Sequence, residues 1–320
     1  MILLLGASGY FGRAFAGELR RRGLSFIPLT RPAFDYTRFD FLFDYLRTIR
    51  PVFLINAANY CAPSQENGSE TEREQAMSAN ALLPQMIARV CLMTKTPWGH
   101  VSSGCIYAGS KIIEDGQMRL EKDLGSPEVR RLFAAHPERF RGFSEEDEAN
   151  FSFRHPPCSF YSGTKALAEE AIHEIGQCYI WRLRLPFNEC DEPCNLLCQQ
   201  PESMDDAINS LSHREDCVKA CLDLWEIRAP CGIYNVTNPG AVVAREIIQD
   251  LPRAARAQRT TTAERFPASS LETHRSNCIL DVSKLLRSGV KIRTVNEALE
   301  ESVVLLRAAL RASKPNGLNN

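Results

Sequence analysis

Three glycines separate the first apolar run of this chain from its first amphipathic stretch: Gly6, Gly9 and Gly12. The run MILLL, residues 1–5, is typical of a buried strand, and apolar side chains recur at helical spacing from residue 11 to about residue 22. Glycine allows a tight turn and lets the backbone approach a pyrophosphate, which binds where the amides of a helix N-terminus lack partners. The pattern predicts a dinucleotide-binding turn, with an ordinary loop as the alternative.

The same order of strand and helix repeats along the chain. Segments at 25–29, 51–57, 179–186 and 232–236, and one that ends at Ser103, predict further strands. Stretches at about 39–49, 70–93 and 162–175 predict the helices between them. The run PVFLINA at 51–57 is continuously apolar, as a strand buried on both faces requires. The alternation predicts an α/β fold with a doubly wound parallel sheet.

Tyr161 and Lys165 stand four residues apart in SFYSGTKALAEEA, residues 159–171, so both project from one face of a helix. A tyrosine with a pKa near ~10 is a poor acid or base at neutral pH unless a cation favours the phenolate, and Lys165 supplies that charge. Ser103, at the end of a strand, can hydrogen-bond a substrate carbonyl. The three residues predict a hydride-transfer site in which Tyr161 protonates the alkoxide as hydride arrives from a nicotinamide.

The residue after the second strand selects between NAD and NADP. An Asp or Glu there binds the ribose 2′-hydroxyl of NAD, whereas an arginine accommodates the 2′-phosphate of NADP. This chain has Thr30 and Arg31 and no acidic residue before Asp35, which favours NADP(H) over NAD(H), and Arg13 could assist. The alternative is that Arg31 is a solvated surface residue.

The pattern divides the chain into two parts. We predict an NADP-binding domain over residues 1–186, to which the strand and helix at 232–252 return, and a smaller substrate-binding lobe from 187–231 and 253–320. A highly charged insertion at 110–141 interrupts the first domain, either as surface decoration or as a lid. Ser126 and Pro127 begin a short helix within it. In the lobe, a short strand at 279–281 and a last helix at about 294–312 are predicted.

Composition bears on the partners and the location of the chain. The net charge of −1 gives no sign of a nucleic-acid or acidic-membrane partner. No segment reaches the ~20 apolar residues of a transmembrane helix and no signal peptide is recognisable, so we expect a cytoplasmic protein. Most of the twelve cysteines are then expected to pack as reduced thiols. Cys190, Cys194 and Cys198 share an i, i+4, i+8 spacing, but Pro193 interrupts it and we expect no metal site.

Further motifs extend the pattern over nearly the whole chain. They are INAANY (55–60), SANALLPQMIA (78–88), SGCIY (103–107), GFSEEDEANF (142–151), SFYSGTKALAEE (159–170), RLRLP (182–186) and IYNVTNPG (233–240). With these motifs, the chain resembles an extended short-chain dehydrogenase/reductase with a Rossmann-type domain. It is most similar to the nucleotide-sugar branch, which includes dTDP-4-dehydrorhamnose reductases, GDP-fucose synthases and plant UDP-4-keto-6-deoxyglucose 3,5-epimerase/4-reductases.

The resemblance implies roles for particular residues. Ser103, Tyr161 and Lys165 would form the reductase triad, supported from behind by Asn80. Cofactor contacts would come from Gly6, Ser8, Gly9, Tyr10, Phe11, Gly12, Arg31, Ala57, Ala58, Asn80, Tyr161 and Lys165. Substrate contacts would come from Ser103, Gly104, Asn188, Asn195 and Arg214. Arg214 would pair with the nucleotide diphosphate, or else form a surface salt bridge with Glu215 or Asp216.

Cys105 follows Ser103 by two residues, where GDP-fucose synthases and the plant enzymes have a proton-transferring cysteine. The resemblance implies that Cys105, with a lowered pKa, moves a proton at C3 or C5 of a 4-keto sugar, both α to the carbonyl. A packed core cysteine is the alternative. The second acid–base residue departs from the family, because Gln199 stands at the nearest aligned position and cannot exchange a proton. His213 and Lys219 are candidate substitutes, and the epimerase half stays open.

We therefore predict an NADPH-dependent enzyme that reduces the 4-keto group of an NDP-6-deoxy-4-ketohexose, coupled to 3,5-epimerisation, as in the synthesis of an NDP-L-rhamnose. One alternative is a 4-keto reductase, or another NDP-sugar epimerase or dehydratase, without 3,5-epimerase activity. A second alternative, of another class, is a non-catalytic NADP-binding sensor or regulatory subunit. The resemblance also implies a homodimer formed through the two helices that flank the sheet. The nucleotide stays open between UDP, dTDP and GDP.

Overall fold

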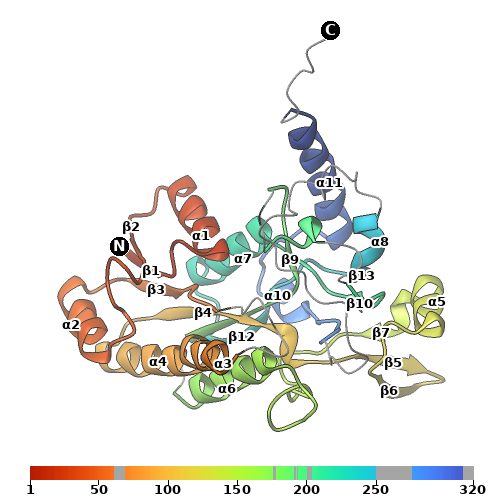
Figure 1. Ribbon diagram of the computed structural model, residues 1–320, viewed down its shortest axis with the longest axis horizontal. Coiled ribbons are helices and arrows are strands. Elements are labelled where there is room, and N and C mark those ends of the chain that lie inside the picture. The colour runs from red at the N-terminus through yellow and green to blue at the C-terminus, as the bar shows by residue number, and fades with distance from the viewer. Residues whose placement is uncertain are drawn as a thin grey trace.

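A six-stranded parallel sheet forms the centre of the computed structural model, which describes residues 1–60, 69–175, 178–190, 192, 194–199, 204–249 and 276–312. The strands lie in the order β12-β8-β4-β3-β1-β2 (Figure 1). Their bounds are Ile2–Leu5 (β1), Phe26–Leu29 (β2), Phe53–Asn56 (β3), Trp98–Ser103 (β4), Cys178–Leu183 (β8) and Gly232–Asn235 (β12). Every residue of β1, β3 and β8 is buried, as in strands covered on both faces.

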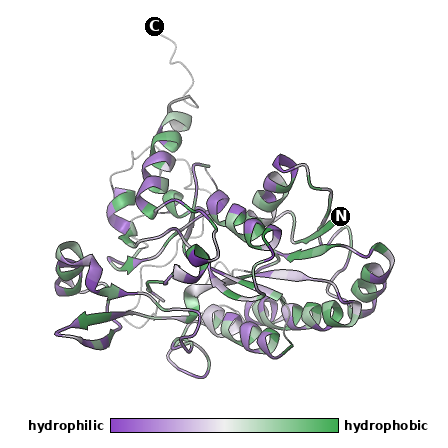
Figure 2. Cartoon of the chain, turned by 180° about the vertical axis from the view of Figure 1, so that it is seen from behind, coloured by the Kyte–Doolittle hydropathy of each residue, from purple (hydrophilic) through white to green (hydrophobic). Residues whose placement is uncertain are grey.

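Helices cover both faces of this sheet and confirm the predicted doubly wound α/β fold (Figure 1). One face carries α1 (Tyr10–Arg21) and α7 (Arg214–Glu226). The other face carries α2 (Phe39–Ile49), α4 (Leu83–Thr94) and α6 (Phe160–Ile175). Figure 2 shows hydrophobic colour along several strands and both colours on the helices, as expected of amphipathic helices that cover a buried sheet.

The order of the strands reverses beside β1. β2 pairs with one edge of β1 and β3 with the other, and the sheet then continues through β4 and β8. In open α/β sheets, ligands bind outside the carboxyl ends of the strands at such a reversal. The glycine turn follows β1, and the INAANY segment continues from β3, so both predicted cofactor segments lie at this edge.

The helix predicted at 70–93 is one helical run with an irregular middle. α3 (Glu70–Met77) joins α4 through a π-helical turn at Ser78–Leu82. Glu70–Thr94 is long and apolar enough to cross a membrane by length and composition, which the sequence analysis did not expect. Half of its most apolar window is buried inside the protein, where α4 packs against α2 and α6. A core helix shows the same features, so the run is weak support for a membrane span.

The insertion at 110–141 folds as a small antiparallel sheet beside one helix. Its elements are β5 (Ser110–Glu114), β6 (Gln117–Glu121), α5 (Pro127–Ala135) and β7 (Phe140–Arg141), with β5 between β6 and β7. The side chain of Ser126 accepts a hydrogen bond from the Val129 amide and caps α5, as predicted. Phe140 packs in one apolar cluster with Ile208 and Ile279. The insertion thus shares a hydrophobic core with the lobe.

The lobe itself is built from short elements. They are β9 (Pro186–Phe187), β10 (Ile208–Asn209), β11 (Ser212–His213), β13 (Val242–Val243), α8 (Ala244–Gln249), α10 (Ser283–Arg287) and α11 (Val295–Ala312). β9 pairs with β11 and β10 with β13. The boundary that we predict between the domain and the lobe stays a prediction.

The strand predicted at 279–281 is wrong. Two isolated parallel bridges take its place, one between Gly109 and Cys278 and one between Phe143 and Leu280. The segment pairs first with Gly109, just before the insertion, and then with Phe143, just after it. Neither pairing continues long enough to form a strand.

Candidate functional site

The backbone of the glycine turn is packed too closely to accept a side chain at Gly6 or Gly12. Gly6 has a φ of +73°, and a Cβ there would lie 2.5 Å from the amide nitrogen of Ala58. A Cβ on Gly12 would lie 2.0 Å from the carbonyl oxygen of Gly6. Gly9, the N-cap of α1, offers no side chain to the first amides, and the first turn has no acidic residue. The turn is a backbone cradle for an anion, which fits the pyrophosphate of a dinucleotide.

Buried polar side chains hold the other side of this cradle. The side-chain amide of Asn80 accepts a hydrogen bond from the Tyr60 N–H and donates one to the Tyr60 carbonyl, at 2.8 Å each. Asn56, at the end of β3, accepts from the Ala58 amide at 3.1 Å and contacts Nδ1 of His100 at 3.1 Å. Asn56, Asn80 and His100 are fully buried, so these bonds fix the loop after β3. The sequence analysis missed Asn56 and His100; the INAANY motif was the available signal for Asn56.

Ser103, Cys105, Tyr161 and Lys165 are brought together at the carboxyl end of β4. Lys165 is 1% exposed; its ammonium donates to the Val101 carbonyl at 3.3 Å and lies 5.9 Å from the centre of the Tyr161 ring. The Ser103 hydroxyl accepts a hydrogen bond from the Cys105 amide at 3.2 Å. Tyr161 packs against the apolar cluster that contains Cys105. A cation, a phenol and a hydroxyl therefore meet at one strand end, as acid–base chemistry on a carbonyl requires.

Cys105 is buried within this constellation. Burial raises the pKa of its thiol, although hydrogen bonds with Ser103 and Ser162 act in the opposite direction. The neighbouring thiol of Cys278 donates to the carbonyl oxygen of Gly104 at 3.2 Å. The expectation of a lowered pKa at Cys105 is therefore wrong for this environment, because desolvation outweighs the hydrogen bonds. At neutral pH the thiol keeps its proton and is suited to donate one.

A buried network of hydrogen bonds and one ion pair joins the elements that carry the site. Ser102 donates to Glu169, and Glu169 pairs with Arg182 at 2.7 Å. Arg182 in turn donates to the hydroxyl of Tyr107 at 2.9 Å. The side chains of Arg182 and Glu169 are only 5% and 6% exposed. This network connects β4, α6 and β8, and the sequence analysis did not predict it.

Replacing Glu169 by alanine should lower the free energy of unfolding by about 3–5 kcal/mol, because it leaves the buried Arg182 without its carboxylate. Urea denaturation of the purified chain measures this loss. Glu170→Ala on the same helix is the matched control, since Glu170 pairs with Arg154 through side chains that are 38% and 71% exposed. Equal stability of the two variants would contradict the proposed importance of the buried pair.

Asn188, Asn195 and Arg214 meet where the lobe reaches the first turn of α1. The Arg214 guanidinium lies 4.5 Å from the centre of the Tyr10 ring. The Asn195 side chain accepts from the amide of Asn188 and donates to its carbonyl, at 3.1 and 2.7 Å. Arg214 pairs with Glu215 at 2.6 Å, so the ion pair of the alternative is present, between side chains that are 9% and 40% exposed. Asn195 thus shapes the loop, and Arg214 lies beside the cofactor turn.

His213 is the N-cap of α7 and lies among acidic side chains. Its Nε2 lies 3.5 Å from Glu189 and 3.8 Å from Glu215, and its Nδ1 lies 3.4 Å from Asp216. Burial opposes protonation, but the hydrogen bonds with Asp216 and Glu189 outweigh it and raise the pKa of His213 to about 9. His213 is therefore held by carboxylates as a cation.

The other residues considered as the second acid–base group of the epimerisation, Lys219 and Gln199, also bond to other residues. Lys219 is half exposed and pairs with Asp223 at 2.6 Å. The Gln199 amide donates to the Asn195 carbonyl at 3.4 Å. Among the described residues, neither His213 nor Lys219 makes a hydrogen bond or ion pair with Cys105.

Of the two arginines considered for the 2′-phosphate, Arg31 is the better placed. It is exposed directly after β2, and its charge acts on the buried Tyr36, which hydrogen-bonds to the backbone of Gly6. Arg13 instead donates to the Ser8 carbonyl at 2.6 Å and pairs with Glu192 of the lobe. Arg31 is thus accessible to a ligand beside the glycine turn, whereas Arg13 ties α1 to the lobe.

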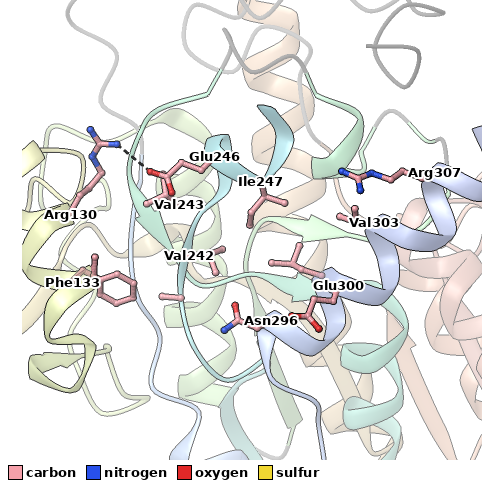
Figure 3. A pocket seen from close by; sticks show the side chains of 13 residues that line it. Arg130, Phe133, Val242, Val243, Glu246, Ile247, Asn296, Glu300, Val303 and Arg307 are labelled. Atoms are coloured by element: carbon pink, nitrogen blue, oxygen red, sulfur yellow. Dashed lines mark ion pairs between the residues drawn. The ribbon is translucent and has the colours of Figure 1, made fainter. Parts of the chain in front are cut away.

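A groove on the outer side of the lobe lies between α5, β13, α8 and α11 (Figure 3). Its walls are mainly apolar, with Phe133, Val243 and Ile247 among them, and Arg130 and Glu246 form an ion pair at its edge, 3.6 Å apart. None of the predicted site residues lines it. The groove is therefore separate from the candidate active site.

The glycine turn at the reversal of the strand order, together with Ser103, Tyr161 and Lys165, is typical of an extended short-chain dehydrogenase/reductase. The chain belongs to the RmlD substrate binding domain family, which it matches over residues 1–307. This match confirms the predicted family.

Two relatives from Arabidopsis thaliana illustrate the similarity. A bifunctional dTDP-4-dehydrorhamnose 3,5-epimerase/dTDP-4-dehydrorhamnose reductase is 25% identical over 260 residues, which cover 79% of this chain and 77% of the relative. A trifunctional UDP-glucose 4,6-dehydratase/UDP-4-keto-6-deoxy-D-glucose 3,5-epimerase/UDP-4-keto-L-rhamnose-reductase is 25% identical over 261 residues. There the match covers 79% of this chain, but the chain spans only 35% of the relative's length.

Solved structures share the fold. A dTDP-4-dehydrorhamnose reductase from Clostridium acetobutylicum has a TM-score of 0.68 at 18% identity, covering 96% of this chain and 99% of that one. A UDP-rhamnose synthase from Acanthamoeba polyphaga mimivirus has a TM-score of 0.67 at 18% identity, covering 95% and 98%. A dTDP-4-dehydrorhamnose reductase from Bacillus anthracis, solved in complex with NADP, has a TM-score of 0.65 at 18% identity, covering 95% and 97%.

Proposed function

We propose that the chain uses NADPH to reduce the 4-keto group of an NDP-6-deoxy-4-ketohexose, coupled to 3,5-epimerisation, in the synthesis of an NDP-L-rhamnose. The meeting of Ser103, Tyr161 and Lys165, at the same edge of the sheet as the glycine turn, carries this proposal. Ser103 binds the carbonyl oxygen, Tyr161 delivers a proton to it, and Lys165 favours the ionised phenol that results. The names of the plant relatives and of the rhamnose synthase support the substrate class.

NADP(H) is the cofactor that the residues fit best. The backbone of the glycine turn receives the pyrophosphate, and the loop after β3 closes its other side. Arg31 takes the 2′-phosphate as a charge-assisted partner. When bound, the nicotinamide supplies the hydride. The Bacillus anthracis structure with NADP supports this choice.

Replacing Arg31 by alanine should raise KM for NADPH about 10-fold, because a charge-assisted hydrogen bond to the 2′-phosphate is lost. KM for NADH should stay the same, since NADH has no 2′-phosphate. Steady-state kinetics with the two cofactors measure the ratio. No change for either cofactor would leave Arg31 as a solvated surface residue, and an equal rise for both would show a contact that does not involve the 2′-phosphate.

Deuterium incorporation tests the coupled epimerisation. The chain is incubated with UDP-4-keto-6-deoxyglucose and NADPH in D₂O, and the sugar product is analysed by NMR. We expect deuterium at C3 and C5, because both protons are removed and returned next to the carbonyl. Cys105→Ala should lose this incorporation by about 10²-fold or more, the usual contribution of a positioned acid, while Cys278→Ala should keep it.

Reduction without deuterium would favour the 4-keto reductase that lacks epimerase activity, with Cys105 as a packed core residue. NADPH binding without turnover on UDP-, dTDP- and GDP-linked 4-keto sugars would favour the sensor or regulatory subunit. The same panel identifies the nucleotide, because only the matching substrate should show a low KM.

The proposed assembly is a homodimer formed through α4 and α6. Large apolar side chains of these helices are exposed: Leu92 and Met93 on α4 are 53% and 59% exposed, and Leu167 on α6 is 39% exposed. Burying such side chains against a second copy is favourable. The predicted cytoplasmic location stays a prediction.

A further inference from the structure

Arg184 is a buried arginine directly after β8, the strand that pairs with β4. It is 5% exposed. Its Nε and Nη2 both donate to the side-chain oxygen of Asn209, at 3.2 and 2.7 Å, and Nη2 also donates to the Ser276 carbonyl. These acceptors are neutral, and no carboxylate among the described residues pairs with Arg184. A buried charge is costly unless an opposite charge compensates it, so this cation suits a place where negative charge appears.

The hydrogen bonds of Arg184 lead to the turn that contains Cys105. The Asn209 oxygen that accepts from Arg184 also accepts from the Cys278 amide, at 3.0 Å. The thiol of Cys278 donates to the carbonyl oxygen of Gly104, at 3.2 Å. Cys278 and Cys105 pack in one apolar cluster. Arg184 and Cys105 are therefore joined through one short segment, although they lie on different strand ends of the sheet.

We propose that Arg184 is a positioning residue of the epimerisation, whose guanidinium stabilises the thiolate that remains when Cys105 gives its proton to the substrate. This inference rests on the proposed function. In that step an enolate of the 4-keto sugar takes the proton at C3 or C5. The electron pair of the enolate forms the new C–H bond and the carbonyl is restored, while the pair of the broken S–H bond stays on sulfur. Water then returns a proton to the thiolate.

The charges around Cys105 have the sign that this step needs. Burial raises the pKa of the thiol and hydrogen bonds with two serines lower it, and the positive charges of Arg184 and Lys165 lower it further. Lys165 also serves the phenol of Tyr161, whereas Arg184 has no acidic partner among the described residues. Fixed charges of this kind are effective in a buried site because water does not screen them. The ionisable side chains near the thiol are those of Arg184, Lys165, Tyr161, Cys158 and Cys278.

Three variants of Arg184 separate its charge from its packing. Arg184→Gln and Arg184→Met remove the charge, so the test does not depend on the folding of one variant, whereas Arg184→Lys keeps it. Arg154→Gln is the matched control, because the Arg154 side chain is 71% exposed. Urea denaturation and NADPH binding show that each variant is folded.

Two measurements are made on the full chain. The first is the rate of deuterium exchange at C3 and C5 of UDP-4-keto-6-deoxyglucose in D₂O, followed by NMR. This rate is divided by the rate at which the same variant reduces UDP-4-keto-L-rhamnose with NADPH, a reaction that needs no epimerisation. The second is the pH dependence of the alkylation of Cys105 by iodoacetamide, followed by mass spectrometry, which reports how readily the thiolate forms.

We expect the two neutral variants to lower the ratio of exchange to reduction by at least about 10-fold. They should also move the alkylation of Cys105 to higher pH, because loss of a nearby cation raises the pKa of a thiol. Arg184→Lys should restore most of the ratio and of the alkylation profile, and Arg154→Gln should change neither.

Two results would overturn the role of Arg184 while the parent chain still exchanges deuterium. One is a ratio and an alkylation profile that do not change in the neutral variants. The other is an equal loss in Arg184→Lys, which would show that Arg184 supplies packing and not charge. Absence of exchange in the parent chain would instead overturn the proposed epimerisation itself, and the step assigned to Arg184 with it.

Discussion

Replacing Tyr161 by phenylalanine should lower kcat/KM for the 4-keto reduction by about 10³-fold, the typical contribution of a positioned general acid. The substitution removes only the hydroxyl that delivers the proton to the substrate oxygen. Lys165 stays in place, because its ammonium is held by the Val101 carbonyl and not by the ring alone. The loss is measured as NADPH oxidation with a 4-keto nucleotide sugar.

Tyr45→Phe is the matched control for this variant. Tyr45 lies on α2, where its ring contacts Phe34 with centroids 4.6 Å apart, so the same substitution is made away from the site. Both variants should bind NADPH as the parent chain does, and only Tyr161→Phe should lose turnover. Retained turnover in Tyr161→Phe would contradict the assignment of Tyr161 as the acid.

The parts of the site that a sequence could predict are those defined by short-range spacing. The glycine turn depends on three positions between one strand and one helix. Tyr161 and Lys165 share a helix face because they are four residues apart. Ser103 is recognised at the end of an apolar run. Each of these features is local, so the alternation of strand and helix was enough to place them all at one edge of the sheet.

The parts that the sequence did not predict depend on contacts between distant segments. Asn56 and His100 lie on neighbouring strands, 44 residues apart in the chain. Glu169 and Arg182 pair between a helix and a strand. A motif can mark one residue, as INAANY marks Asn56, but nothing in local spacing says which distant residue it contacts in the folded chain.

The pKa of Cys105 illustrates the same limit. Its position in the motif SGCIY indicated a proton-transferring thiol, but the direction of the pKa shift depends on burial. Burial arises from segments far along the chain, including Cys278 and Leu280. Sequence spacing could therefore locate the thiol, while the packing decides the direction in which its pKa shifts.

Replacing Gly12 by alanine should destabilise the chain and weaken cofactor binding together. The new Cβ would lie 2.0 Å from the Gly6 carbonyl oxygen and 2.8 Å from the Cα of Ala7. Both are backbone atoms, so the start of α1 must move away from the turn. We expect the free energy of unfolding to fall by about 3 kcal/mol, at the upper end for overpacking. The helix N-terminal amides move as well, so NADPH should bind at least about 10-fold more weakly.

Gly17→Ala separates this steric effect from the general preference of a helix for alanine. Gly17 lies on the same helix and is exposed, and a methyl group added there would meet no atom of the described chain within 4 Å, so alanine should stabilise the protein by up to about 1 kcal/mol. Urea denaturation and fluorescence titration with NADPH measure both variants. Because the two substitutions add the same methyl group to one helix, opposite signs can come only from the contact at the glycine turn. If Gly12→Ala were instead as stable as Gly17→Ala and bound NADPH normally, the close packing of the cradle would be wrong, and with it the assignment of the pyrophosphate to this turn.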